Sequence, residues 1–145
     1  MDPITLDAHP AEGHSGDYTV QVAGAIAEAV RVLNYASLAG TGKDGLPYPS
    51  TIYDVVGRLQ AATSGMDQLF RQMRARLADI AAEHEVTVSH GLYRDNPAAA
   101  VADAIDALET EQRAADGLEG ALTYAHNALS PIGVRIPADD EEAGQ

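Results

Sequence analysis

The sequence predicts an all-α protein: a long antiparallel helical hairpin over residues 50–85 and 96–129, preceded by a shorter helix over residues 17–39. Two observations support this prediction. Apolar residues recur with helical spacing through each of the three segments, and turn-forming Gly and Pro gather between them. We expect the three helices to assemble as a bundle, because a long amphipathic helix buries its apolar stripe against another element.

The first predicted helix follows residues 1–16, which are rich in Gly, Pro and His and show little periodicity, so we expect a flexible arm there. Asp17 is the expected N-cap. Val22, Ile26 and Leu33 share one face at 100° per residue, and further apolar residues widen that face past half of the circumference. Such a helix is usually covered on two sides.

The second predicted helix follows a connection rich in Gly and Pro, with Ser50 as its expected N-cap. Its apolar residues fall within an arc of about 140° at 100° per residue. They are Ile52, Val55, Val56, Leu59, Met66, Leu69, Phe70, Met73, Leu77 and Ile80. The phase of this stripe does not change across Gly65, although Gly costs roughly 1 kcal/mol relative to Ala inside a helix. One continuous helix is therefore predicted.

The third predicted helix begins with Asn96 as N-cap and Pro97 at the first helical position, and it ends at Ser130 and Pro131. Its apolar stripe comprises Val101, Ile105, Leu108, Ala115, Leu118, Leu122, Ala125 and Leu129. Residues 86–93 favour extended structure locally, but no partner strand is evident, so we expect a loop. In both long helices the stripe drifts by about 20° per heptad, which is typical of left-handed coiled-coil packing.

The expected organisation is one helical domain over residues 17–130, followed by a flexible acidic tail over residues 131–145. Each long helix is about 50 Å in length at 1.5 Å per residue, whereas the first helix reaches only about 34 Å. One short helix cannot cover the apolar seam of two long ones. We therefore predict a homodimer, in which a second copy of the chain covers the seam; another protein is the alternative partner.

Composition excludes several classes of function. The absence of Cys removes disulfides, Cys-based zinc sites and thiol nucleophiles. No segment has the 18 apolar residues of a membrane span, and the N-terminus lacks a basic region followed by an apolar run, so we expect a cytoplasmic protein without membrane contact. A net charge of −13 argues against direct binding of nucleic acid.

We predict no cofactor, no metal and no enzymatic activity. None of the five His forms a His-Glu-x-x-His pair, and no Gly-x-Ser-x-Gly elbow is present. The segment Gly40–Lys43 resembles a phosphate-binding loop only in part, because Ser37 and Asp44 stand where that loop needs Gly and Ser or Thr. A metal-binding helical bundle is the last alternative, but Glu83 and the acids of the third helix lack the Glu-x-x-His spacing.

Three groups of residues are candidate interaction sites. Arg71, Arg74 and Arg76 form a basic patch. The alternative interpretation is pairing within the helix, of Asp67 with Arg71 and of Arg76 with Asp79, together with attraction to the acidic third helix. The acids of residues 94–129, where the net charge is −5, suggest a second function: Asp103, Asp106 and Glu109 are carboxylates with which an acidic decoy would imitate DNA toward a basic DNA-binding protein. The third group is Pro47, Tyr48 and Tyr53, at the entry to the second helix. We expect Tyr48 and Tyr53 to form an aromatic contact there. This contact is either a staple that fixes the entry of the chain into the helix or part of a binding surface.

The segment Gly45-Leu-Pro-Tyr-Pro-Ser-Thr-Ile-Tyr-Asp-Val-Val56, with Leu69-Phe-Arg-Gln-Met73 further on, is similar to small helical proteins of unknown function from actinobacteria, some of them from plasmids and integrated mobile elements. The resemblance covers residues 25–85. It implies a helical fold and an accessory role in such elements, and it carries no catalytic residue. From the residues themselves we predict a non-enzymatic helical interaction or assembly protein with a coiled-coil-like seam.

Overall fold

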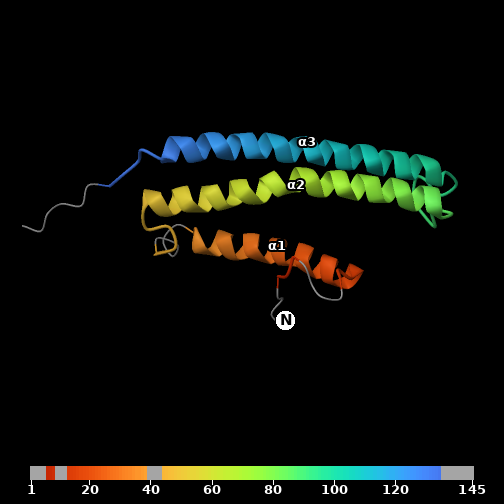
Figure 1. Ribbon diagram of the computed structural model, residues 1–145, viewed down its shortest axis with the longest axis horizontal. Coiled ribbons are helices and arrows are strands. Elements are labelled where there is room, and N and C mark those ends of the chain that lie inside the picture. The colour runs from red at the N-terminus through yellow and green to blue at the C-terminus, as the bar shows by residue number, and fades with distance from the viewer. Residues whose placement is uncertain (1–5, 9–12, 39–43, 135–145) are drawn as a thin grey trace, which may run out of the picture. The chain divides into compact units, whose positions relative to one another are not determined.

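The computed structural model describes residues 6–8, 13–38 and 44–134. The secondary structure of these ranges consists of α-helices, without a β-strand. The helices are α1 (Gly16–Ala36), α2 (Pro49–Glu83) and α3 (Pro97–Leu129) (Figure 1). The all-α class and the three helices are thereby confirmed. Much of the predicted N-terminal arm and most of the predicted acidic tail lie outside the described residues.

The chain divides into two compact units, residues 1–47 and 48–145, and the prediction of a single domain over 17–130 stays a prediction. The first unit contains α1, whose N-cap is Ser15 and not the predicted Asp17. The Ser15 hydroxyl accepts a hydrogen bond from the Tyr18 backbone N–H at 3.1 Å, while Asp17 occupies the first turn. No residue of α1 is buried.

In the second unit, α2 is one continuous helix of 35 residues, as the unbroken phase of its stripe predicts. It begins one residue earlier than expected. Tyr48 occupies the N-cap position without a side-chain hydrogen bond, and Pro49 stands in the first turn, where its missing N–H has no intrahelical partner to lose. The expected cap, Ser50, lies inside the helix instead.

The start of α3 agrees with the prediction. The Asn96 side-chain oxygen accepts a hydrogen bond from the Ala99 backbone N–H at 3.2 Å, and Pro97 follows in the first turn. Residues 84–96 connect α2 to α3 without forming a strand. Within this connection Gly91 has φ of 86°, a left-handed conformation that a residue with a Cβ rarely adopts.

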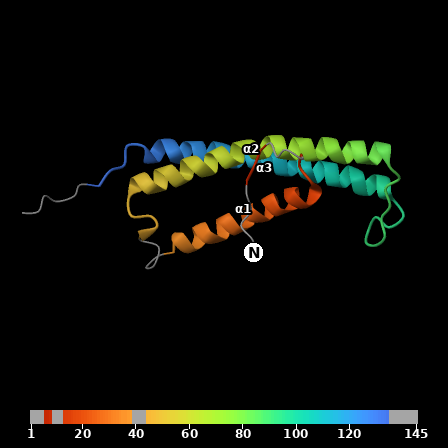
Figure 2. The same cartoon turned by 60° about the horizontal axis from the view of Figure 1, so that its bottom comes forward.

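The two long helices lie side by side along their lengths, as both views show (Figures 1 and 2). Their side-chain contacts pair rising residue numbers on α2 with falling numbers on α3. These pairs are Tyr53 with His126, Gln60 with Thr123, Asp67 with Gln112, and Arg74 with Glu109. Across the described residues, no helix is long and apolar enough to cross a membrane.

Candidate interaction surfaces

The contact between α2 and α3 follows a 3–4 spacing on both helices, and we call these two rows of residues the inner seam. On α2 it comprises Tyr53, Val56, Gln60, Thr63, Asp67, Phe70, Arg74, Leu77 and Ala81. On α3 it comprises Val101, Ile105, Leu108, Gln112, Ala115, Glu119, Leu122, His126 and Leu129. Every one of these residues is buried or half-buried. The spacing is the heptad pattern of a coiled coil.

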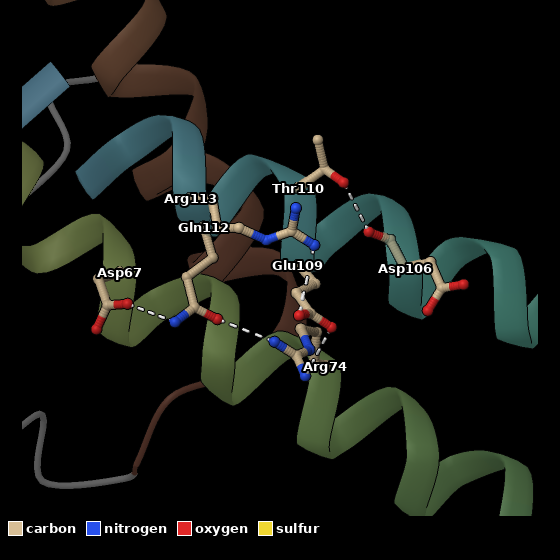
Figure 3. Close-up of polar contacts among 7 residues, drawn as sticks. All are labelled: Asp67, Arg74, Asp106, Glu109, Thr110, Gln112 and Arg113. Carbon is tan, nitrogen blue, oxygen red and sulfur yellow. Dashed lines mark hydrogen bonds and ion pairs between the residues drawn. The ribbon is translucent and has the colours of Figure 1, made fainter. Parts of the chain in front are cut away.

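The middle of the inner seam is polar (Figure 3). The Gln112 side-chain N–H donates to the Asp67 carboxylate at 2.5 Å, and a terminal N–H of Arg74 donates to the Gln112 carbonyl oxygen at 3.0 Å. Arg74 also forms an ion pair with Glu109 at 3.5 Å. We call these four side chains the polar network. Its one unsatisfied buried atom in the described part of the chain is the Arg74 Nε.

The polar network favours one register of α2 against α3. Asp67 and Arg74 stand two helical turns apart on α2, and only Gln112 bridges them through both halves of its amide. A shift of one turn would separate the amide from both charged groups and leave it half-buried without partners. Partly buried polar groups of this kind are known to fix register in helical pairs, although they add little net stability.

Near the start of α2 the inner seam contains an aromatic stack and a neutral hydrogen bond in place of charged groups. The Tyr53 ring stacks on the His126 imidazole with ring centroids 3.9 Å apart. Gly57 makes room for this imidazole, since a Cβ at position 57 would lie 3.0 Å from His126 Nε2. One turn further, the Gln60 amide donates to the Thr123 hydroxyl at 3.0 Å. The ring of Tyr53 therefore packs against α3, and the contact between Tyr48 and Tyr53 stays a prediction.

A second row of residues on each helix directly precedes the inner seam by one position, and we call these rows the outer seam. On α2 it comprises Ile52, Val55, Leu59, Ala62, Met66, Leu69, Met73, Arg76 and Ile80. On α3 it comprises Ala100, Ala104, Ala107, Glu111, Ala114, Leu118, Ala121, Ala125 and Ala128. It also has heptad spacing, but most of it is exposed. Leu69 is 44% exposed, Met73 45% and Leu118 50%.

Most of the apolar stripe that defines α2 in the sequence thus lies in the outer seam, beside the residues that contact α3. Across the described residues only Ala115 among the apolar residues and Thr63 among the polar ones are buried. The two helices meet through a mixed seam with charged and amide groups in its middle, while the more apolar row of α2 stays open to solvent.

The predicted basic patch is divided between two roles. Arg71 is exposed and pairs with Asp67 within α2, which agrees with the intrahelical interpretation. Arg74 points across to α3 and belongs to the polar network (Figure 3). Arg76, which we expected to meet Asp79, pairs instead with Glu83 at 3.4 Å.

The predicted acidic residues of α3 are engaged to different degrees. Asp103 accepts a hydrogen bond from the Tyr93 hydroxyl, and this hydrogen bond, together with the negative charge of the carboxylate, raises the pKa of Tyr93. Glu109 lies between Arg74 and Arg113, the second at 3.4 Å (Figure 3). At Asp106 it is the backbone oxygen that accepts a hydrogen bond, from the Thr110 hydroxyl at 3.1 Å.

Of the predicted residues at the entry to α2, Pro47 and Tyr48 are exposed, and Tyr48 is 54% accessible. Within the described ranges, no group of three His, Asp or Glu side chains is placed to hold a metal ion. Comparisons of the chain with protein-family models, with curated proteins and with solved structures find no match. The resemblance to actinobacterial helical proteins stays a prediction.

Sequence reasoning missed Gln60 and Gln112 as contact residues. A signal for them exists. On α2, Gln60, Asp67 and Arg74 fall in heptad phase with Val56, Phe70 and Leu77, and this second register would have shown a mixed seam beside the apolar one.

Proposed function

We propose that this chain is a non-enzymatic helical assembly protein in which α2 and α3 form an antiparallel hairpin that self-associates as a homodimer. One observation carries the proposal: α2 and α3 together bury only Thr63 and Ala115, although each carries a long apolar row. A domain of this length normally hides roughly two-thirds of its chain surface. Apolar surface on this scale marks an association site in soluble proteins.

The free energy that dimerisation gains by burying apolar surface follows from the exposure of the outer seam. Six of its large side chains retain between 36% and 50% exposure: Ile52, Leu59, Leu69, Met73, Ile80 and Leu118. Full burial of such a side chain is worth about 1.5–3 kcal/mol, so covering the remaining two-fifths gains about 0.6–1.2 kcal/mol each. Association also costs several kcal/mol of translational and rotational freedom. We therefore expect a dimer with a Kd in the micromolar range.

Sedimentation equilibrium of the full chain across the micromolar range tests the proposal. We expect a species with twice the chain mass of 15.2 kDa. Leu69→Asp places a charge in the outer seam of both subunits, and we expect it to weaken association at least about 100-fold, because an unpaired buried carboxylate costs several kcal/mol. Gln68→Asp is the matched control, since it adds the same charge to an exposed neighbour.

Circular dichroism establishes that both variants keep their helices. A wild-type chain that sediments only as a monomer throughout this range would refute the proposal. Equal dimerisation of the Leu69→Asp and Gln68→Asp variants would exclude the outer seam as the interface.

The acidic decoy is the second function that the sequence suggests. It would require exposed carboxylates that a basic DNA-binding protein can reach. Asp103 and Glu109 are both engaged within the chain, and among the described residues the Asp106 side chain has no polar partner. Competition between the chain and DNA for a basic partner, measured at several salt concentrations, tests this function. Self-assembly has the broader support, because it accounts for the whole exposed seam.

A further inference from the structure

The outer seams of α2 and α3 lie on the same side of the proposed antiparallel hairpin. On each helix the outer seam precedes the inner seam by one residue, which is a rotation of 100° about the helix axis. Because the two helices run in opposite directions, these rotations have opposite senses when viewed from one end. Both outer seams therefore turn toward one common face, which we call the apolar face.

The opposite face of the hairpin is polar. The residues that follow the inner seam by one position include Asp54, Arg71, Asp106, Arg113 and Asp116. The apolar face carries only Arg76 and Glu111 as charged residues. Its two halves also differ in size, because α2 contributes Leu, Ile, Val and Met, whereas α3 contributes mainly Ala.

The area of the apolar face fits a second copy of the chain. Each helix is about 50 Å long and about 10 Å across with its side chains, so the face measures on the order of 1,000 Å². A stable protein interface of standard size takes about 800 Å² from each partner. A partner hairpin of the same length would cover this face from end to end.

Two hairpins can stack face to face about a two-fold axis in two ways. In the first, the axis runs along the bundle, the two α2–α3 connections lie at the same end, and α2 of each subunit packs on α3 of the other. In the second, the axis is perpendicular to the bundle, the connections lie at opposite ends, and each helix packs on its own copy.

We propose that the dimer adopts the first arrangement, with α2 of each subunit against α3 of the partner. This inference rests on the proposed homodimer. The large residues of α2, such as Leu69 and Met73, would then meet an alanine row and not each other, which lets the helices approach closely and fills the interface evenly. In the second arrangement, large residues would oppose large ones and alanines would oppose alanines.

Charge selects the same arrangement. Residues 50–85 hold four Arg and five acids, net −1, whereas residues 94–129 hold two Arg and seven acids, net −5. Placing α3 beside α3 of the partner would bring the two most acidic helices together. It would also place Glu111 within about 6 Å along the axis of Glu111 of the partner subunit, because both lie near the middle of a 33-residue helix. Two carboxylates in an apolar interface repel each other.

Disulfide trapping distinguishes the two arrangements, and the absence of Cys from the sequence makes single-Cys variants clean probes. Met66 and Ala114 lie in the outer seams at the same level, since Asp67 contacts Gln112 nearby. The full-length Met66→Cys variant, carrying a mass tag, is mixed with the full-length Ala114→Cys variant and oxidised under mild conditions. Gln68→Cys, on an exposed position, reports chance collisions.

We expect the mixture to yield a disulfide between the tagged and untagged chains, and each variant alone to give no more cross-linking than Gln68→Cys. In a square bundle the two α2 helices stand about 13 Å apart on the diagonal, beyond the 7 Å Cα–Cα limit of a disulfide. Self-linking of Met66→Cys and of Ala114→Cys, without the mixed product, would overturn this arrangement. So would a dimer by sedimentation that forms none of these disulfides.

Sedimentation of the same reduced samples separates this inference from the function on which it rests. If the reduced variants and the wild-type chain are monomers, the proposed homodimer is refuted. This is the outcome expected if α1 of the same chain covers the apolar face. If they are dimers with the wrong disulfides, only the arrangement fails.

Discussion

Gln112→Ala is the sharpest test of how the two long helices recognise each other. The substitution removes both hydrogen bonds that join Asp67 to Arg74, at 2.5 and 3.0 Å. A hydrogen bond to a charged group is worth about 1.5–3 kcal/mol when it is shielded from water. The side chains of Asp67 and Arg74 are 24% and 29% exposed, so solvent screening reduces each contribution. We expect a loss of about 2–3 kcal/mol of unfolding free energy.

Urea unfolding followed by far-ultraviolet circular dichroism, at one fixed chain concentration, measures this loss. Gln68→Ala is the control, because it removes the same amide from an exposed site of α2, and we expect a change within about 0.5 kcal/mol. Gln112→Leu keeps most of the side-chain volume, so a similar loss there assigns the effect to the hydrogen bonds. If Gln112→Ala unfolds at the same urea concentration as the wild type, the polar network does not hold the helices together.

Three further substitutions test local features. The Asp103 carboxylate raises the pKa of Tyr93 above its ordinary value of 10.0, so the contact between them stabilises the fold fully below pH 10 and is lost as the pH rises through the folded-state pKa. Tyr93→Phe should remove this alkaline dependence of the urea midpoint. A profile of midpoint against pH that is unchanged in the variant would contradict the contact. A Cβ at position 65 would meet no atom within 4 Å, so Gly65→Ala should raise the unfolding free energy by about 0.5–1 kcal/mol. A Cβ at position 57 would lie 3.0 Å from His126 Nε2, so Gly57→Ala should show no such increase in the same assay.

Helix identity was predictable because it depends on local patterns. The unbroken phase across Gly65 predicted one continuous α2, and the Asn96-Pro97 pair predicted the start of α3. The other two predicted caps were each wrong by two residues. At α1, Ser15 and Asp17 are both good N-caps, and the choice between them depends on which oxygen reaches a backbone N–H. At α2, Pro49 fixes the first turn and leaves Ser50 inside the helix.

The packing of α2 was less predictable, because its apolar stripe is wide enough to include two heptad registers. Val56, Phe70 and Leu77 of that stripe belong to the inner seam, whereas Leu59, Leu69 and the others belong to the outer seam. A helical wheel places all of these residues within one arc and does not say which edge of the arc meets a neighbour. That choice depends on the residues of the other helix, which the periodicity of α2 does not contain.

The residues of α3 explain why its partner takes the polar edge. Its own inner seam contains Gln112, Glu119 and His126, all half-buried. If α2 were rotated by one residue, the apolar outer seam would meet these three side chains, and the Gln112 amide would lose both Asp67 and Arg74 without reaching water freely. Burying an amide without partners costs about 1–3 kcal/mol, which offsets the gain from one or two extra apolar contacts. The polar network thus holds α2 in the one orientation that leaves its most apolar row exposed, beside the alanine row of α3, where a second hairpin can cover both.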